Sequence, residues 1–195
     1  MKFLHISYQR AFFPLLLVLS LAGIVVILYA TNWGAALSDD SYFYIKPARD
    51  MLAGQPYRLS PHYAPALPYL LTAIGWTGID PQNGIRYLNA FCFGLNIFLL
   101  GWVVWRISGR RGAGLCAAGL VLLSQPMIEV HAWAMSEALF ISLVLGCFVT
   151  LQVYFKKHGH QWLLGAAVLA GVLALTRYAG LALIAAGRAG PRLGV

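Results

Sequence analysis

Two adjacent carboxylates, Asp39 and Asp40, are the side chains of this sequence best suited to acid–base chemistry. They follow shortly after a long apolar run, and they account for two of only 6 acidic residues in 195. A carboxylate held beside a hydroxyl can remove its proton as a general base. We interpret the pair as the floor of an active site at the outer membrane surface. Two solvated loop carboxylates are the open alternative.

The composition restricts the class of protein that carries this pair. Apolar residues make up 60% of the chain, charged residues 10%, and the mean hydropathy is +0.72. These values exclude an ordinary soluble domain and indicate a membrane protein with several spans. The net charge of +8 could suit nucleic acid, but the bases fall in small clusters between apolar runs. We therefore expect the lipid bilayer as a partner and no nucleic acid.

Five apolar stretches predict five membrane-spanning helices. The first covers residues 11–30, about the 20 residues that a helix needs to cross the hydrocarbon core. This run is longer than the apolar part of a signal peptide, so we expect it to remain as an uncleaved span. The later spans are expected at 84–105, 112–127, 137–155 and from Trp162 to Ala186.

Two short helices are expected in the polar stretch between the first two spans. Side chains over 41–53 repeat at helical spacing, and Gly54 fits the stop of such a helix. A proline-rich turn then leads into an apolar helix at 67–76, whose length of about 15 Å is too short to cross a membrane. Asp80 and Pro81 fit the N-cap and the first position of the second span.

The distribution of charge along the chain predicts the orientation. The amino end and the turns at 106–111 and 156–157 together hold seven Lys and Arg residues and no acid. Residues 31–84 hold four acids against three bases, and 128–137 holds two acids and no base. Loops rich in Lys and Arg stay in the cytoplasm. We therefore expect a multi-pass protein of the cell membrane with its amino end in the cytoplasm.

This orientation gathers titratable side chains at the outer face. Arg177 follows Trp162 by 15 residues, about 22 Å along a helix, which brings it close to that face. Group transfer from a lipid phosphate donor fits such a set, because a carboxylate can deprotonate the acceptor and a cation can stabilise the leaving phosphate. The residues expected there are Asp39, Asp40, His62, Glu129, His131, Glu137 and Arg177.

The cysteines and histidines give no sign of a metal site. Cys92, Cys116 and Cys147 all lie inside apolar runs, where we expect buried thiols that pack as small hydrophobic side chains. No His, Cys or acid cluster has metal-ligand spacing. No metal site and no cofactor are predicted, and a divalent cation stays an open option.

Several short segments, taken in order, resemble the amino-terminal part of one family of membrane enzymes. They are Leu37–Tyr42, Ala48–Tyr57, His62–Tyr69, Arg86–Ala90, Ser136–Phe140 and Leu175–Gly180. From residue 1 to about 185 the chain resembles the GT-C class of membrane glycosyltransferases. Within that class it looks like bacterial relatives of dolichyl-phosphate-mannose protein mannosyltransferases and like the RgtA/B/C/D-like enzymes. The resemblance implies an inverting enzyme that moves a sugar from a polyprenyl phosphate donor to a glycan, lipid or protein acceptor outside the cytoplasm.

The resemblance also implies roles for individual side chains. Asp39 takes the place of the catalytic base, and Arg177 takes that of the cation at the donor phosphate. The other expected site residues are Asp40 and Glu137 as assisting acids, Lys46 and Arg49 at the phosphate, and Tyr42, His62 and Tyr178 at donor or acceptor. Two alternatives stay open. Glu137 could merely favour the N-terminal end of its helix, and Arg177 could snorkel to the interface.

The sequence thus predicts an all-α polytopic membrane protein with about five transmembrane helices and two short surface helices in the first outer loop. Residues 1–187 are expected to form a single transmembrane domain, and 188–195 a polar tail left by truncation, because family members continue into further spans. A small transporter or flippase-like protein is the alternative from another class, and an inactive fragment is the third. Charges at the ends of the spans and the lack of a repeat favour the enzyme.

Overall fold

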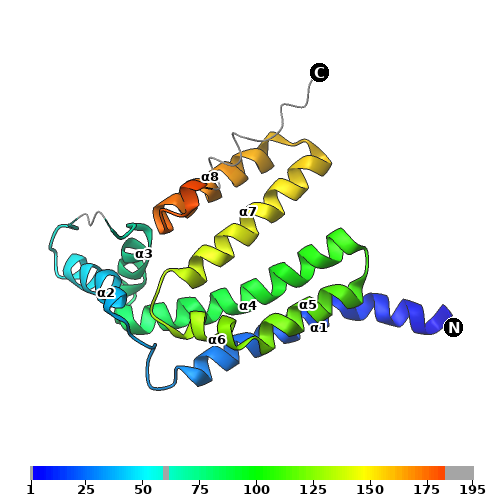
Figure 1. Cartoon of the computed structure of the whole chain (residues 1–195), viewed down its shortest axis with the longest axis horizontal. Coiled ribbons are helices and arrows are strands. Elements are labelled where there is room, and N and C mark those ends of the chain that lie inside the picture. The colour runs from blue at the N-terminus through cyan, green and yellow to red at the C-terminus, as the bar shows by residue number, and fades with distance from the viewer. Residues whose placement is uncertain (1, 59–61, 183–195) are drawn as a thin grey trace.

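The computed structural model describes residues 2–58 and 62–182, and within these the side chains from residue 11 onward. This part of the chain is all-helical, as predicted, apart from one isolated bridge between Ala36 and Trp133. Ser60, Pro61 and the predicted tail at 188–195 lie outside the described residues. The helices labelled in Figure 1 are α1 (Lys2–Ala30), α2 (Asp39–Leu52), α3 (Ala66–Gly75), α4 (Pro81–Ser108), α5 (Arg111–Leu123), α6 (Gln125–Ala132), α7 (Glu137–Lys157) and α8 (His160–Thr176).

Three of these helices are long and apolar enough to cross a membrane, namely α1 over Ala11–Ala30, α4 and α7. The pair α5 and α6 passes the same test together, but it is bent by 58° and gives a fourth span only if the bent pair counts as one. α8 is apolar but short, with 17 residues, and it ends where the backbone of Arg177 becomes extended. The described residues therefore contain three or four candidate spans where the sequence predicts five.

The third predicted span and the loop predicted after it form two helices instead of one helix and a loop. We expected one helix over 112–127 and a loop over 128–136, but the helix breaks at Ser124 and a new helix, α6, runs to Ala132. Pro126 explains the break, because proline is tolerated in the first turn of a helix but not in its interior. His131 is therefore held on a helix and buried, with its Nε2 2.9 Å from Asn96 Nδ2, and does not lie in a loop.

Local sequence signals set the ends of several helices. Asp80 caps α4, as predicted, because its Oδ1 accepts a hydrogen bond from the Gln82 N–H at 2.9 Å. The Ser41 hydroxyl accepts a hydrogen bond from the Ser38 N–H at 2.9 Å at the start of α2. Gly54 follows the end of α2 with φ +79°, a conformation that favours glycine. Helices α2 and α3 begin and end within two residues of the predicted bounds.

Helices α1, α4 and α5 form the main bundle, in which small residues let the backbones approach. A Cβ on Gly94 would lie 2.8 Å from the Ser20 carbonyl of α1, and the Ser20 hydroxyl donates to the Gly94 carbonyl at 2.7 Å. Between α4 and α5, a Cβ on Gly101 would lie 3.0 Å from the Gly114 carbonyl. Such close packing is what drives helix association inside a membrane. Of the thiols expected to be buried, Cys116 of α5 is instead exposed.

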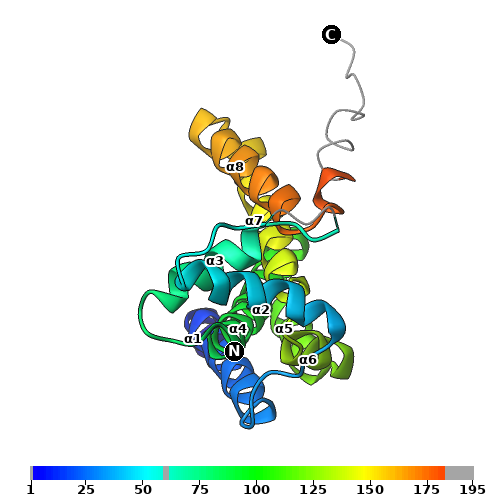
Figure 2. The same cartoon turned by 90° about the vertical axis from the view of Figure 1, so that its left-hand side faces the viewer.

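The pair α7 and α8 stands apart from this bundle and diverges from it toward one end of the molecule (Figure 1, Figure 2). α7 packs on α4 near its own start, where the Ser142 hydroxyl lies 3.5 Å from the Cys92 carbonyl. α7 and α8 hold each other through a cluster that includes the buried side chains of Cys147, Ala166 and Leu173. The two helical units therefore meet at one end and separate at the other.

The acidic side chains lie at only one of these two ends, together with five of the bases. Helices α2 and α3 lie across the end where α4 and α7 begin (Figure 1). We term this the acidic end, because it carries all six carboxylates of the sequence, Asp39, Asp40, Asp50, Asp80, Glu129 and Glu137. We term the opposite end, at the turns that follow α4 and α7, the basic end, with Arg106, Arg110, Arg111, Lys156 and Lys157.

Candidate functional site

A cavity of about 360 Å³ opens at the acidic end and gathers five of the nine predicted site residues. Helix α2, the segment before α3, the start of α7 and the end of α8 each supply part of its wall. The lining residues are Asp40, Tyr44, His62, Tyr63, Ala64, Met135, Glu137, Thr176, Arg177, Tyr178 and Ala179. Acids, a cation and hydroxyls that are far apart in the sequence therefore face one space.

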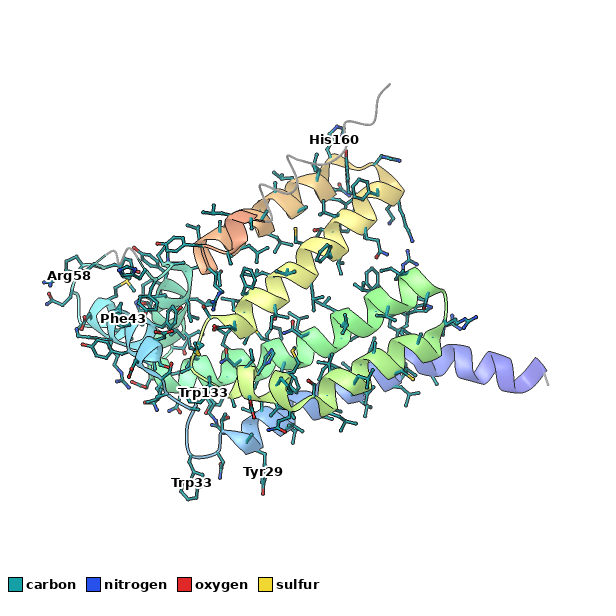
Figure 3. All side chains as sticks on the ribbon, in the orientation of Figure 1. Tyr29, Trp33, Phe43, Arg58, Trp133 and His160 are labelled. Atoms are coloured by element: carbon teal, nitrogen blue, oxygen red, sulfur yellow. The ribbon has the colours of Figure 1, made fainter. Side chains whose placement is uncertain are left out.

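Asp40 is the carboxylate of the acidic pair that faces this cavity. The Tyr63 hydroxyl donates a hydrogen bond to Asp40 Oδ1 at 2.6 Å. The ring of Phe43, labelled in Figure 3, stacks on the Tyr63 ring with the centroids 4.4 Å apart, which fixes the position of the phenol. The bond to the carboxylate raises the pKa of Tyr63 to about 12. Tyr63 therefore remains a proton donor to Asp40 at neutral pH.

Glu137 and Arg177 form an ion pair in the same cavity. They belong to the first turn of α7 and the residue after α8, and their side chains are 28% and 36% exposed. Arg177 Nη1 also lies 3.4 Å from the Ser136 hydroxyl, which lies 3.2 Å from the Tyr44 hydroxyl. Glu137 Oε2 is buried and has no hydrogen-bond partner among the described residues. A phosphate in this cavity would meet the Arg177 guanidinium and would compete with Glu137 for it.

Asp39, the predicted catalytic base, does not line the cavity. It is the first residue of α2 and is exposed. Successive residues of an α-helix point about 100° apart, and in this structure the rotation of α2 turns Asp40, not Asp39, toward the cavity. Asp40 shares its side of α2 with Tyr44, one turn later. The charge of Asp39 at a helix N-terminus is favourable with respect to the helix dipole without any catalytic role.

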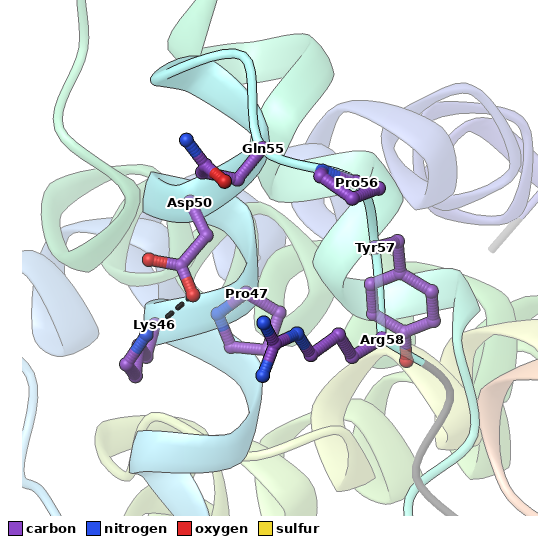
Figure 4. A pocket seen from close by; sticks show the side chains of 7 residues that line it. All are labelled: Lys46, Pro47, Asp50, Gln55, Pro56, Tyr57 and Arg58. Atoms are coloured by element: carbon purple, nitrogen blue, oxygen red, sulfur yellow. Dashed lines mark hydrogen bonds and ion pairs between the residues drawn. The ribbon is translucent and has the colours of Figure 1, made fainter.

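The other predicted phosphate contacts, Lys46 and Arg49, lie away from Arg177. Lys46 forms an ion pair with Asp50 at the edge of a separate cavity of about 270 Å³ (Figure 4). Arg49 binds Asp80 through two hydrogen bonds of 3.0 and 2.8 Å, which lower the pKa of that carboxyl. Tyr42 lies with both bases in a further cavity of about 340 Å³. These three residues therefore do not share the space that holds Arg177.

Another, more apolar cavity of about 410 Å³ lies against the cavity that holds Arg177. Met135 and Glu137 line both cavities, so only this short stretch of chain separates them. Trp133, labelled in Figure 3, lines the apolar cavity, and its carbonyl accepts a hydrogen bond from Asn89 Nδ2 at 2.7 Å. We term this more apolar cavity the apolar groove. It is lined by Ser38, Pro126, Glu129, Val130, Trp133, Met135 and Glu137. A polar cavity and an apolar groove therefore lie side by side.

Several contributors to the site were not among the predicted residues, and three of them hydrogen-bond to one another or to predicted residues, namely Tyr44, Ser136 and Tyr63. Tyr44 stands one helical turn after Asp40, and this spacing could have placed both on one face. Burial is the largest cause of the raised pKa of Tyr44, which keeps its phenol protonated. Ser136 and Tyr63 each adjoin a predicted residue in the sequence, but nothing in the sequence indicated which hydroxyls would meet.

The chemistry available to the cavity is that of a base, a cation and several hydroxyl donors. Asp40 can accept a proton, and Arg177 can hold a phosphate oxygen. Within residues 2–58 and 62–182, no group of three or more His, Cys, Asp or Glu side chains is placed to hold a metal ion. No protein family, curated protein or solved structure that was compared with this chain matches it.

Proposed function

We propose that the protein is a membrane glycosyltransferase of the GT-C class, which moves a sugar from a polyprenyl phosphate donor to an acceptor hydroxyl outside the cytoplasm. The observation that carries the proposal is the cavity at one end of the apolar helices in which Asp40 lies with Glu137 and Arg177. A base beside a phosphate-binding cation suits a donor with its phosphate at the membrane surface and its tail in the bilayer. The order of the sequence motifs supports the same class.

The proposal includes five spans, formed by α1, α4, the bent pair α5–α6, α7 and α8. With 17 residues α8 would reach about 26 Å, somewhat less than the hydrocarbon core of about 30 Å. Helices α2 and α3 would then lie on the outer surface, and the amino end in the cytoplasm. The turns that follow α4 and α7 hold five bases and no acid, which supports this orientation, because bases collect on the cytoplasmic side.

In the proposed reaction Asp40 takes the proton of the acceptor hydroxyl as its oxygen attacks the anomeric carbon of the sugar. The bond between that carbon and the donor phosphate oxygen breaks as the new bond forms, so the configuration inverts. The phosphate leaves with the bonding electron pair, and Arg177 stabilises the charge that develops on it. Tyr63 fixes the Asp40 carboxylate, and Glu137 orients the guanidinium.

The apolar groove suits the first isoprene units of such a donor. It shares Met135 and Glu137 with the polar cavity, so a lipid whose phosphate reaches Arg177 can lay its chain along Val130 and Trp133. A polar cavity without an adjacent apolar groove would suit a water-soluble sugar phosphate instead. The pairing of the two spaces therefore favours a lipid-linked donor.

The test uses the protein in lipid nanodiscs with undecaprenyl phosphate as the binding probe and a panel of undecaprenyl-phosphate monosaccharides as donors. Mass spectrometry follows the release of undecaprenyl phosphate in the presence of a membrane glycan and lipid extract. Asp40→Asn should keep binding and lower release about 10²–10⁴-fold, because the amide cannot accept the proton. Arg177→Gln should weaken both binding and release. Asp80→Asn is the control and should be nearly silent, because Asn caps a helix about as well as Asp.

Asp39→Asn distinguishes the base predicted from the sequence from the one that faces the cavity. Loss of release in Asp39→Asn with full release in Asp40→Asn would assign the base to Asp39. Full release in both variants would remove the acidic pair from the mechanism. Movement of the intact sugar lipid across the bilayer without release would favour a flippase-like transporter over the enzyme.

A further inference from the structure

The basic end carries charge that no described carboxylate neutralises. Its five bases sit at the end of α4, the start of α5 and the end of α7. All six carboxylates of the sequence lie at the acidic end, and the ion pairs found among the described residues use Lys46, Arg49 and Arg177. These bases therefore have no carboxylate partner among residues 2–58 and 62–182.

A cleft of about 350 Å³ at this end brings part of that charge together with aromatic rings. Four helices line it: α1, α4, α7 and α8. Its cations are Arg106, Lys156 and Lys157, and its indole rings are Trp102, Trp105 and Trp162. Three of the six tryptophans of the chain thus line one cleft. Tryptophan favours the boundary between lipid and water, because its ring is apolar and its N–H is a donor.

Arg106 is already oriented within the cleft by its neighbours. Its guanidinium carbon lies 5.6 Å from the centroid of the Trp102 ring and 5.8 Å from that of Trp105. These cation–π contacts leave N–H groups of the guanidinium available to bind a planar or tetrahedral anion. A guanidinium held in this way is a phosphate ligand that loses little conformational entropy on binding.

The cleft also has apolar side chains in its lining, and it lies where α4 and α7 diverge (Figure 1). α4 and α7 diverge toward the basic end, and His160 marks the start of α8 at the outer corner of this wedge (Figure 1, Figure 3). Phe13 and Val153 line the cleft beside the cations. A ligand with a charged head and an apolar body fits this combination, whereas a small soluble anion would leave the apolar side unused.

We propose that the cleft at the basic end binds an anionic phospholipid, with its phosphate at Arg106, Lys156 and Lys157 and its acyl chains in the wedge between α4 and α7. Basic pockets between transmembrane helices on the cytoplasmic side are suited to anionic headgroups. The site lies at the opposite end from the glycosyl-transfer cavity, so it does not depend on that function. The bound lipid would contact α4 and α7 together at the cleft that both helices line.

Native mass spectrometry of the protein released from nanodiscs tests the site with phosphatidylglycerol as the anionic probe and phosphatidylcholine as the neutral one. The wild type should retain one phosphatidylglycerol and no phosphatidylcholine. Arg106→Gln should weaken the retention about ten-fold, and the double variant Lys156→Gln with Lys157→Gln further, because each loses a charge-assisted hydrogen bond to the phosphate. Arg110→Gln, in the turn between α4 and α5 and outside the cleft, removes the same charge and should change retention less than two-fold.

Three results would overturn the proposal. Equal loss in Arg106→Gln and Arg110→Gln would show diffuse attraction to a charged surface. Equal retention of the two lipids by the wild type would show that the headgroup charge is not recognised. Saturable binding of glycerol phosphate in detergent, with the affinity of phosphatidylglycerol, would assign the cleft to a soluble phosphate. Far-UV circular dichroism of each variant shows whether it is folded, and the double variant tests the site independently if Arg106→Gln does not fold.

Discussion

The ion pair between Glu137 and Arg177 joins the start of α7 to the end of α8, and removing the cation should destabilise the protein by about 1–3 kcal/mol. An exposed pair contributes about 0–1 kcal/mol, and loss of one partner from a buried pair costs about 3–5 kcal/mol. The two side chains are 28% and 36% exposed, and Glu137 Oε2 is buried without a partner among the described residues. The expected cost therefore lies between these limits.

A double-mutant cycle measures this interaction directly. Arg177→Gln leaves a partly buried carboxylate without its cation, whereas Arg177→Gln combined with Glu137→Gln removes both charges. The double variant should therefore be more stable than Arg177→Gln alone, with a coupling energy of about 1 kcal/mol or more. In nanodiscs, Arg177→Gln should lower the apparent Tm by about 2–12 °C, followed by tryptophan fluorescence at a single scan rate.

Lys46→Gln is the matched control, because it also removes the cation from an ion pair with one carboxylate, Asp50. The ion pair of Lys46 with Asp50 is more exposed, at 48% and 43%, so its loss should cost less than about 1 kcal/mol. A coupling energy below about 0.3 kcal/mol between Glu137 and Arg177 would refute the reasoning. An equal loss of stability in Lys46→Gln and Arg177→Gln would also refute it, because burial of the ion pair would then not govern the free energy that its loss costs.

Three further outcomes are expected. The pKa of the Tyr63 phenol should be about 12 and should fall toward 10.0 in Asp40→Asn, measured as the alkaline absorbance difference between each protein and its Tyr63→Phe version. Because the folded-state pKa is raised, the contribution of this hydrogen bond to stability is complete below pH 10 and is lost as the pH rises through 12. Gly101→Leu should lower stability by about 1–3 kcal/mol in thermal unfolding, whereas Gly119→Leu, with no neighbour within 4 Å, should be nearly neutral. Gly109→Cys should react with an impermeant maleimide only from the cytoplasmic side. Labelling of this cysteine in intact cells would contradict the proposed topology.

The site residues were recovered from the sequence only in part. Asp40, Glu137 and Arg177 were expected near one another and line one cavity. The sequence could not distinguish Asp39 from Asp40, because their roles depend on how α2 is rotated about its axis. That rotation is set by the burial of Ile45 and similar side chains against α3 and α4, which is a property of the packed structure.

The sequence by itself determined the class of protein and the positions of most helices. Both follow from local properties, namely the apolar runs, the Asp80–Pro81 start of α4 and the Gly54 stop after α2. Only the tertiary structure decided which side chains share a cavity, because contacts such as Glu137–Arg177 join residues 40 positions apart. It also decided the aromatic and basic cleft, since four helices must pack and diverge in a particular way to form it. Hydrogen bonds within a helix depend on neighbouring residues alone, whereas the relative placement of helices depends on every surface that they bury.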